Sequence, residues 1–107
     1  LSSRVSIYSS SDDYSGEHLT NPTVPARYLG VHAAPVRLGR HVIVGSGSVI
    51  LPGCPLDEGC AVGALSLVTK SLAPWTVHSG TPARRVMARS RRLLELEAEL
   101  RADAAAA

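Results

Sequence analysis

The fold is decided by residues 38–73, LGRHVIVGSGSVILPGCPLDEGCAVGALSLVTKSLA. An α-helix repeats about every 3.6 residues and a strand about every two, so neither accounts for a period of six. The period predicts an internal repeat in which each hexapeptide forms a short strand and a corner. The aliphatic residues that carry it are Leu38, Val44, Ile50, Leu56, Val62 and Val68.

Three hexapeptides close one triangular coil of 18 residues, so residues 38–55 and 56–73 form two coils. Backbone hydrogen bonds between coils would hold them at the strand spacing of about 4.8 Å. Repeat architectures generally need about three units, so further coils or partner subunits are expected. Inward side chains stack on the residue one coil later, which gives the pairs Leu38–Leu56, Val44–Val62 and Ile50–Val68.

The flanking segments differ from these coils, which we assign to residues 36–80. Residues 1–8 alternate weakly and predict a strand of an upstream coil. Residues 9–35 are polar, contain three prolines and lack a period, which predicts a long excursion loop; such loops in a compact domain are usually functional or disordered. Thr81 and Pro82 have the form of a helix N-cap and first helical position, which places a C-terminal helix and tail in residues 81–107. The predicted helix, residues 83–103, has the apolar stripe Val86, Leu93, Leu96 and Leu100.

Composition restricts the function classes. The 107 residues suffice for one small domain, and the net charge of +2 does not indicate a nucleic-acid partner. No apolar run reaches the roughly 20 residues of a membrane span, and no signal peptide is present. Cys54 and Cys60 fit neither a metal motif nor a disulfide framework, so a reduced, cytoplasmic protein is expected. The first residue, Leu1, suggests a fragment.

The coil stretch continues into VTK (residues 68–70) and GTPAR (residues 80–84), and together they resemble the C-terminal part of the hexapeptide-repeat acyltransferases. That family includes galactoside, maltose and polysaccharide O-acetyltransferases. The resemblance implies an all-β fold, a left-handed parallel β-helix with a C-terminal α-helix. It also implies a homotrimer that binds acetyl-CoA between subunits and acetylates a hydroxyl or amine of a small, sugar-like acceptor.

The same resemblance implies the cofactor site. Leu65 departs from the family pattern, because glycine is common at its position. The implied cofactor-binding residues are Ser46 and Ala64 along pantetheine, Thr69 and Lys70 near the adenine end, and Arg84 with its neighbour Arg85 at the phosphates.

The catalytic base is not given by the resemblance, because the usual Asn-His or Gly-His motif is missing before the coils. Acyl transfer needs a base for the attacking group. His18, His32 and Asp13 in the excursion loop are the candidates. His41 is expected to be a plain surface residue, and His78 is expected to be part of the local structure after the coils. Two alternative functions stay open: a non-catalytic trimeric β-helix module, and a γ-type zinc carbonic anhydrase. The zinc enzyme needs three histidine ligands, and only His41 lies in the regular coils.

Overall fold

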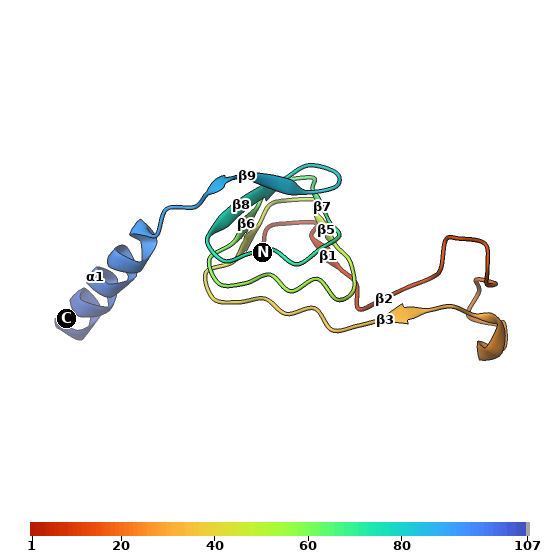
Figure 1. The fold of residues 1–107 in the computed structure, drawn as a ribbon. Helices are drawn as coiled ribbons and strands as arrows, with labels where there is room; N and C mark the ends of the chain where they lie inside the picture. Colours follow the sequence, from red (N-terminus) through yellow and green to blue (C-terminus); the bar gives the residue numbers. More distant parts are fainter. Residues whose placement is uncertain (107) are drawn as a thin grey trace.

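The computed structural model describes residues 1–106 as a series of short strands followed by one α-helix (Figure 1). The molecule is elongated, with extents of 60 × 29 × 21 Å. The expectation of a strand-rich chain that ends in a helix is confirmed. In chain order the elements are β1 (Ser6–Ile7), β2 (Ser10–Ser11), the 3-10 helix η1 (Ala26–Tyr28), β3 (His32–Ala33), β4 (Ile43–Val44), β5 (Val49–Ile50), β6 (Ala61–Val62), β7 (Leu67–Val68), β8 (Thr76–Ser79), β9 (Arg84–Ala88) and α1 (Arg92–Ala106).

Successive coils stack through parallel strand pairs. β4 pairs with β6 and β5 pairs with β7, and each residue faces the one 18 positions later. In the next coil Leu56 pairs with Leu72 and Val62 pairs with His78, which shows that this coil is two residues shorter. The hexapeptide period therefore predicts the first step of the stack and not the second. The three predicted pairs, Leu38–Leu56, Val44–Val62 and Ile50–Val68, are confirmed.

The core is a narrow column inside these coils. Complete burial of an aliphatic side chain such as Val44 or Ile50 stabilises the fold by about 1.5–3 kcal/mol. Leu38 was expected to point into the core, but it is 41% exposed because no described residue stacks before it. Burial raises the pKa of the Cys60 thiol to about 11, so this cysteine is no nucleophile. The core residues are Val44, Ile50, Cys54, Leu56, Cys60, Val62, Val68 and Leu72.

The corners of the coils need left-handed backbone. Gly47 has a φ of 73°, and Leu65, one coil later, has a φ of 57°. Glycine adopts this region freely, whereas a residue with a Cβ pays a steric cost. A second corner repeats the conformation in His41, Gly59 and Trp75. Trp75 is buried and packs over Gly59, where a Cβ would lie 2.3 Å from the indole ring, so the indole covers this corner of the coils.

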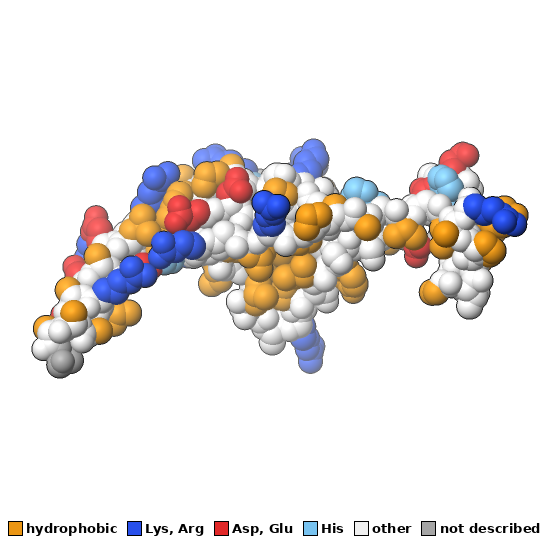
Figure 2. Space-filling view, turned by 90° about the horizontal axis from the view of Figure 1, so that it is seen from below, with side chains coloured by type: hydrophobic (Ala, Val, Ile, Leu, Met, Phe, Trp, Pro, Cys, Tyr) orange, Lys and Arg blue, Asp and Glu red, His pale blue; other side chains and the backbone are white. Residues whose placement is uncertain are grey.

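The N-terminal segment joins the same stack. Ser6 of β1 pairs with Val49 of β5, 43 positions later, because the excursion is inserted between the two coils. We call residues 12–31 the arm; β2 and β3 pair antiparallel at its base. None of residues 9–35 is buried. The arm and α1 project from opposite ends of the coils, and both expose hydrophobic side chains (Figures 1 and 2).

The C-terminal segment corrects one prediction. Residues 83–103 were expected to be helical, but residues 84–88 form β9, which pairs antiparallel with β8. The last coil would otherwise leave the edge of β8 unpaired, and strand pairing satisfies those backbone groups. Thr81 is consequently no N-cap, and Val86 lies outside the helix. The helix begins at Arg92, whose backbone N–H donates to Ser90 Oγ at 3.1 Å.

The helix α1 is attached to the coils by polar contacts. Glu97 Oε2 lies 2.6 Å from His41 Nε2, and Glu97 Oε1 lies 2.9 Å from Arg101. Arg89 donates to the carbonyl oxygens of His41 and Gly59. His41 was expected to be a plain surface residue; it is instead half-buried and holds the helix.

We predict that Leu65→Gly raises the free energy of unfolding by about 1 kcal/mol, because it removes the left-handed strain of a residue with a Cβ. Little packing is lost, since Leu65 is 75% exposed. Urea unfolding measures the change. Gly47→Ala, at the matching corner, is the control and should be destabilising; a Leu65→Gly protein no more stable than the wild type would refute the prediction.

Candidate functional site

A column of small residues runs along one corner of the stack. Ser3 Oγ lies 3.4 Å from Ser46 Oγ, and the N–H of Leu65 donates to the carbonyl oxygen of Ser46 at 2.9 Å. Ala64 follows Ser46 by one coil, and the N–H of Leu67 donates to Gly80 O in the coil after that. Ser46 and Ala64, both named from the sequence, therefore lie in neighbouring coils at one corner of the stack.

Basic residues lie near the end of this column. Ala83 N donates to Leu67 O at 2.8 Å, which puts Arg84 beside β7, the strand that precedes Thr69 and Lys70. Arg84 and Arg85 are exposed on β9, opposite Ser79 and His78. Within residues 1–106, no ion pair occupies Lys70, Arg84 or Arg85. These three cations are free to contact an anionic ligand.

His78 is a poor additional cation at this end. Burial, and then the charge of Arg85, lowers the pKa of the imidazole. Its Nδ1 lies 3.3 Å from Thr76 Oγ1, whose hydroxyl donates to Ala73 O. His78 therefore has a structural environment, as the sequence predicts.

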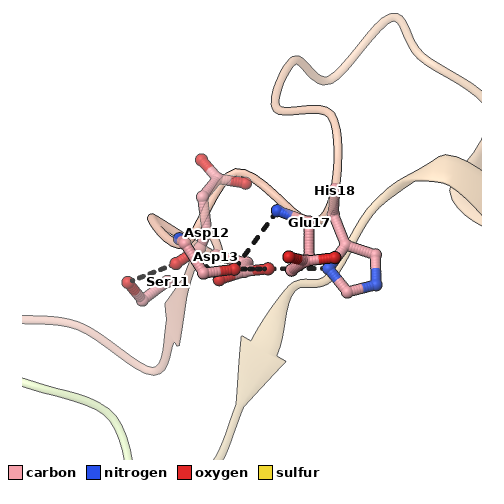
Figure 3. A network of polar contacts seen from close by, with 6 residues as sticks. Ser11, Asp12, Asp13, Glu17 and His18 are labelled. Atoms are coloured by element: carbon pink, nitrogen blue, oxygen red, sulfur yellow. Dashed lines mark hydrogen bonds and ion pairs between the residues drawn. The ribbon is translucent and has the colours of Figure 1, made fainter.

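The arm holds a polar network around Asp13 (Figure 3). Asp13 Oδ2 lies 2.6 Å from His18 Nδ1 and accepts from Ser15 Oγ at 2.8 Å. Asp13 Oδ1 accepts from Ser15 N at 2.9 Å. The imidazole packs over Gly30, where a Cβ would lie 2.5 Å from Nδ1, so any larger residue at position 30 would displace His18. Of the three catalytic candidates, the structure brings Asp13 and His18 together.

This network gives the two residues different chemistry. The hydrogen bonds from His18 and Ser15 lower the pKa of Asp13 from 3.8 to about 2, so Asp13 is a poor proton acceptor near neutral pH. A carboxylate at Nδ1 favours the tautomer with the proton on that nitrogen, which leaves Nε2 with its lone pair. In this pair Asp13 orients the imidazole, and Nε2 of His18 is the nitrogen left free to accept a proton.

His32 lies at the base of the arm. It pairs with Ser11 across β2 and β3, and its side chain is exposed. No hydrogen bond links it to Asp13 or His18 in the part of the chain that the structure describes. Within residues 1–106 there is also no group of three residues able to hold a metal ion, so no observation favours the zinc enzyme.

Asp12 is not among the residues predicted for the site, yet it lines a cavity. A pocket of about 410 Å³ lies between the base of the arm and the coils, lined among others by Tyr8, Ser11, Asp12, Tyr14 and Val49. A second pocket, of about 270 Å³, shares Asp12 and Ser11. In Figure 3 the Asp12 side chain points away from the pair of Asp13 and His18. Adjacent residues in an extended segment point to opposite sides, which gives the two aspartates different surroundings.

Another cavity, of about 520 Å³, lies under α1. His41, Glu97 and Leu96 are among its lining residues, and none of the residues predicted for the site lines it. None of the helices in residues 1–106 is long and apolar enough to cross a membrane.

No family model matches the chain. It is 48% identical over 104 residues to a dTDP-4-amino-4,6-dideoxy-D-glucose acyltransferase of Escherichia coli, a match that covers 97% of this chain and 54% of the relative. It is also 37% identical over 54 residues to the galactoside O-acetyltransferase of Escherichia coli K12, covering 50% of this chain and 27% of the relative. The chain spans about half the length, or less, of the curated relatives it matches.

Solved structures of acyltransferases also superpose on this chain. The N-acyltransferase AntD from Bacillus cereus, in complex with dTDP and 3-hydroxybutyryl-CoA, superposes with a TM-score of 0.90 at 42% identity and covers 94% of this chain and 54% of its own. A galactoside acetyltransferase in complex with coenzyme A superposes with a TM-score of 0.68 at 26% identity, covering 83% of this chain and 41% of that one.

We predict that His18→Asn raises the pKa of Asp13, measured by carboxyl-carbon NMR titration, whereas His32→Asn leaves it unchanged. Because the folded-state pKa lies below the unfolded one, the Asp13 carboxylate contributes stability above pH 4, which is lost as the pH falls towards 2. An Asp13 that titrates near 2 in His18→Asn would contradict the geometry.

Proposed function

We propose that this chain, which belongs to the hexapeptide-repeat acyltransferase family, is part of an enzyme that transfers an acyl group from its CoA thioester to an amino sugar carried by a nucleotide. The match to an aminosugar acyltransferase over 97% of the chain is the observation that carries this proposal. The sequence left hydroxyl and amine acceptors open. Both relatives that match nearly the whole chain favour the amine: one is named for an aminosugar and the other is an N-acyltransferase.

The assembly follows from the same proposal. We propose that the coils wind into a left-handed parallel β-helix and that three copies form a homotrimer. The exposed hydrophobic side chains of the arm and α1, among them Tyr14, Leu19 and Leu96, support an assembly that covers them. We place the enzyme in the cytoplasm, because Cys54 and Cys60 are free thiols and acyl-CoA is the donor.

The cofactor would lie along the column of small residues. Ser46 and Ala64 leave room for pantetheine against the backbone, and Thr69 lies towards the adenine. Lys70 and Arg84, with Arg85 beside them, would face the phosphates as cations without ion-pair partners of their own. The acyl group is acetyl, as the sequence suggests, or a related short acyl group such as the 3-hydroxybutyryl group bound by the Bacillus cereus enzyme.

The chemistry requires a base. The amine nitrogen bonds to the thioester carbonyl carbon, the C–S bond breaks, and the departing thiolate takes up a proton while the nitrogen loses one. We assign removal of the nitrogen's proton to Nε2 of His18, with Asp13 holding Nδ1. His32 is the second candidate, since β3 holds it at the base of the same arm.

The variants solved for the Bacillus cereus enzyme lend support to an aspartate in this region. One aspartate and one serine, ten positions apart, were replaced there. In the present sequence the only pairs with this order and spacing are Ser2–Asp12 and Ser3–Asp13. In both pairs the aspartate, Asp12 or Asp13, lies at the start of the arm.

We predict that acetyl-CoA binds with a saturable isotherm in calorimetry and that Lys70→Ala and Arg84→Ala each weaken the affinity about tenfold, since each removes one charge-assisted contact to phosphate. Arg37→Ala, which removes the same charge elsewhere, should leave the affinity unchanged. If all three variants lose the same affinity for acetyl-CoA, the loss reflects net charge and not a specific contact. If the folded protein does not bind acetyl-CoA, the proposed function is refuted.

We further predict that His18→Ala lowers kcat about a hundredfold while the Kd of acetyl-CoA stays the same. Loss of a base lowers kcat and leaves cofactor binding intact, whereas loss of structure would weaken both. A variant with unchanged kcat would transfer the assignment to His32, and His32→Ala tests it in the same assay.

A further inference from the structure

Leu65 combines a strained backbone with an exposed apolar side chain. In the part of the chain that the structure describes, four residues with a Cβ have left-handed backbone. Two of them make contacts within the fold that compensate the strain, since Trp75 is buried and His41 pairs with Glu97. Arg4 is exposed but charged, so water solvates it. Leu65 is apolar and 75% exposed, and strain without a packing gain points to a role in function.

The side chain of Leu65 lies over the preceding coil. A Cβ at Gly47 would lie 2.6 Å from Leu65 Cδ2, so the leucine covers the space that Gly47 leaves empty. The N–H of Leu65 donates to Ser46 O, and Thr81 Oγ1 donates to Leu65 O at 3.4 Å from the following coil. Leu65 therefore places a large apolar side chain beside Ser46 and Ala64, the residues proposed to line the pantetheine arm.

The distribution of charge around this corner matches the pantetheine arm of CoA. Ser46, Gly47 and Ala64 are uncharged, whereas the cations Lys70 and Arg84 lie near the end of the column. A ligand that fits this surface is neutral along the coils and anionic at one end. Pantetheine is neutral, and where it joins the phosphates it carries two methyl groups on one carbon. Those methyl groups are apolar surface that a leucine side chain can cover.

We propose that Leu65 is a cofactor-binding residue whose side chain packs against the two methyl groups of the pantetheine arm. This rests on the proposed function and adds an apolar contact to a site described so far by small residues and cations. The corner keeps a strained residue because binding, and not folding, gains from its side chain. Glycine at this position would suit the backbone and would leave the arm without the contact.

Leu65→Gly tests the proposal because its effects on stability and on binding should have opposite directions. Calorimetry should show the Kd of acetyl-CoA rising about fivefold, as expected for the loss of one partly buried leucine contact, while the protein unfolds at a higher urea concentration. Adenosine 3′-phosphate 5′-diphosphate has the phosphates of CoA but no pantetheine, and its Kd should be unchanged. A purely structural role would not separate the two ligands.

Three further variants act as controls. Leu65→Asn keeps a side chain of similar size that tolerates left-handed backbone, and it should lose affinity for acetyl-CoA as Leu65→Gly does. Leu65→Met remains apolar and should keep most of the affinity. Leu94→Asn makes the change from leucine to asparagine in α1 and should leave the Kd of both ligands unchanged.

Three results would overturn the inference and leave the proposed function standing. One is an unchanged Kd of acetyl-CoA in Leu65→Gly, and another is an equal loss of affinity for both ligands. The third is a change of oligomeric state in Leu65→Gly, measured by analytical ultracentrifugation, which would assign the side chain to a subunit contact. If the folded wild type does not bind acetyl-CoA, the proposed function and the inference both fail.

Discussion

The hydrogen bonds from each coil to the coil above are the constraint on which the rest of the structure depends. Strands of two residues have almost no independent stability, and here they persist only because residues 18 positions apart pair in parallel. That pairing fixes which side chains face inward. It also fixes which positions form corners, and therefore where the backbone must adopt a left-handed conformation.

The same stacking gives the proposed cofactor surface its form. Residues one coil apart share a position on the surface, so Ser46 and Ala64 make a line of small side chains rather than isolated sites. The shortened last coil then brings Gly80 into that line and turns the chain back as β9. Arg84 reaches the end of the line because β9 pairs with β8 instead of continuing into a helix.

The two projections from the coils are held differently. The helix is tied to a corner by Glu97, His41 and Arg89, so its position depends on charge and hydrogen bonding more than on burial. The arm is organised by Asp13, which binds Ser15 and His18 within the arm itself. Neither the arm nor the described part of α1 contributes a buried residue, so the core of the described residues lies within the coils.

The sequence by itself determined the coils, because a period of six in Leu38, Val44 and Ile50 has one simple structural explanation and acts through neighbours along the chain. It also indicated the arm's candidates and the basic residues near Lys70. Tertiary structure alone decided three things: the strand at residues 84–88, the helix contact of His41, and the different surroundings of Asp12 and Asp13. Each depends on which groups meet across the fold. A strand edge needs a partner, a corner histidine meets a distant glutamate, and neighbouring carboxylates point to opposite sides, none of which local spacing records.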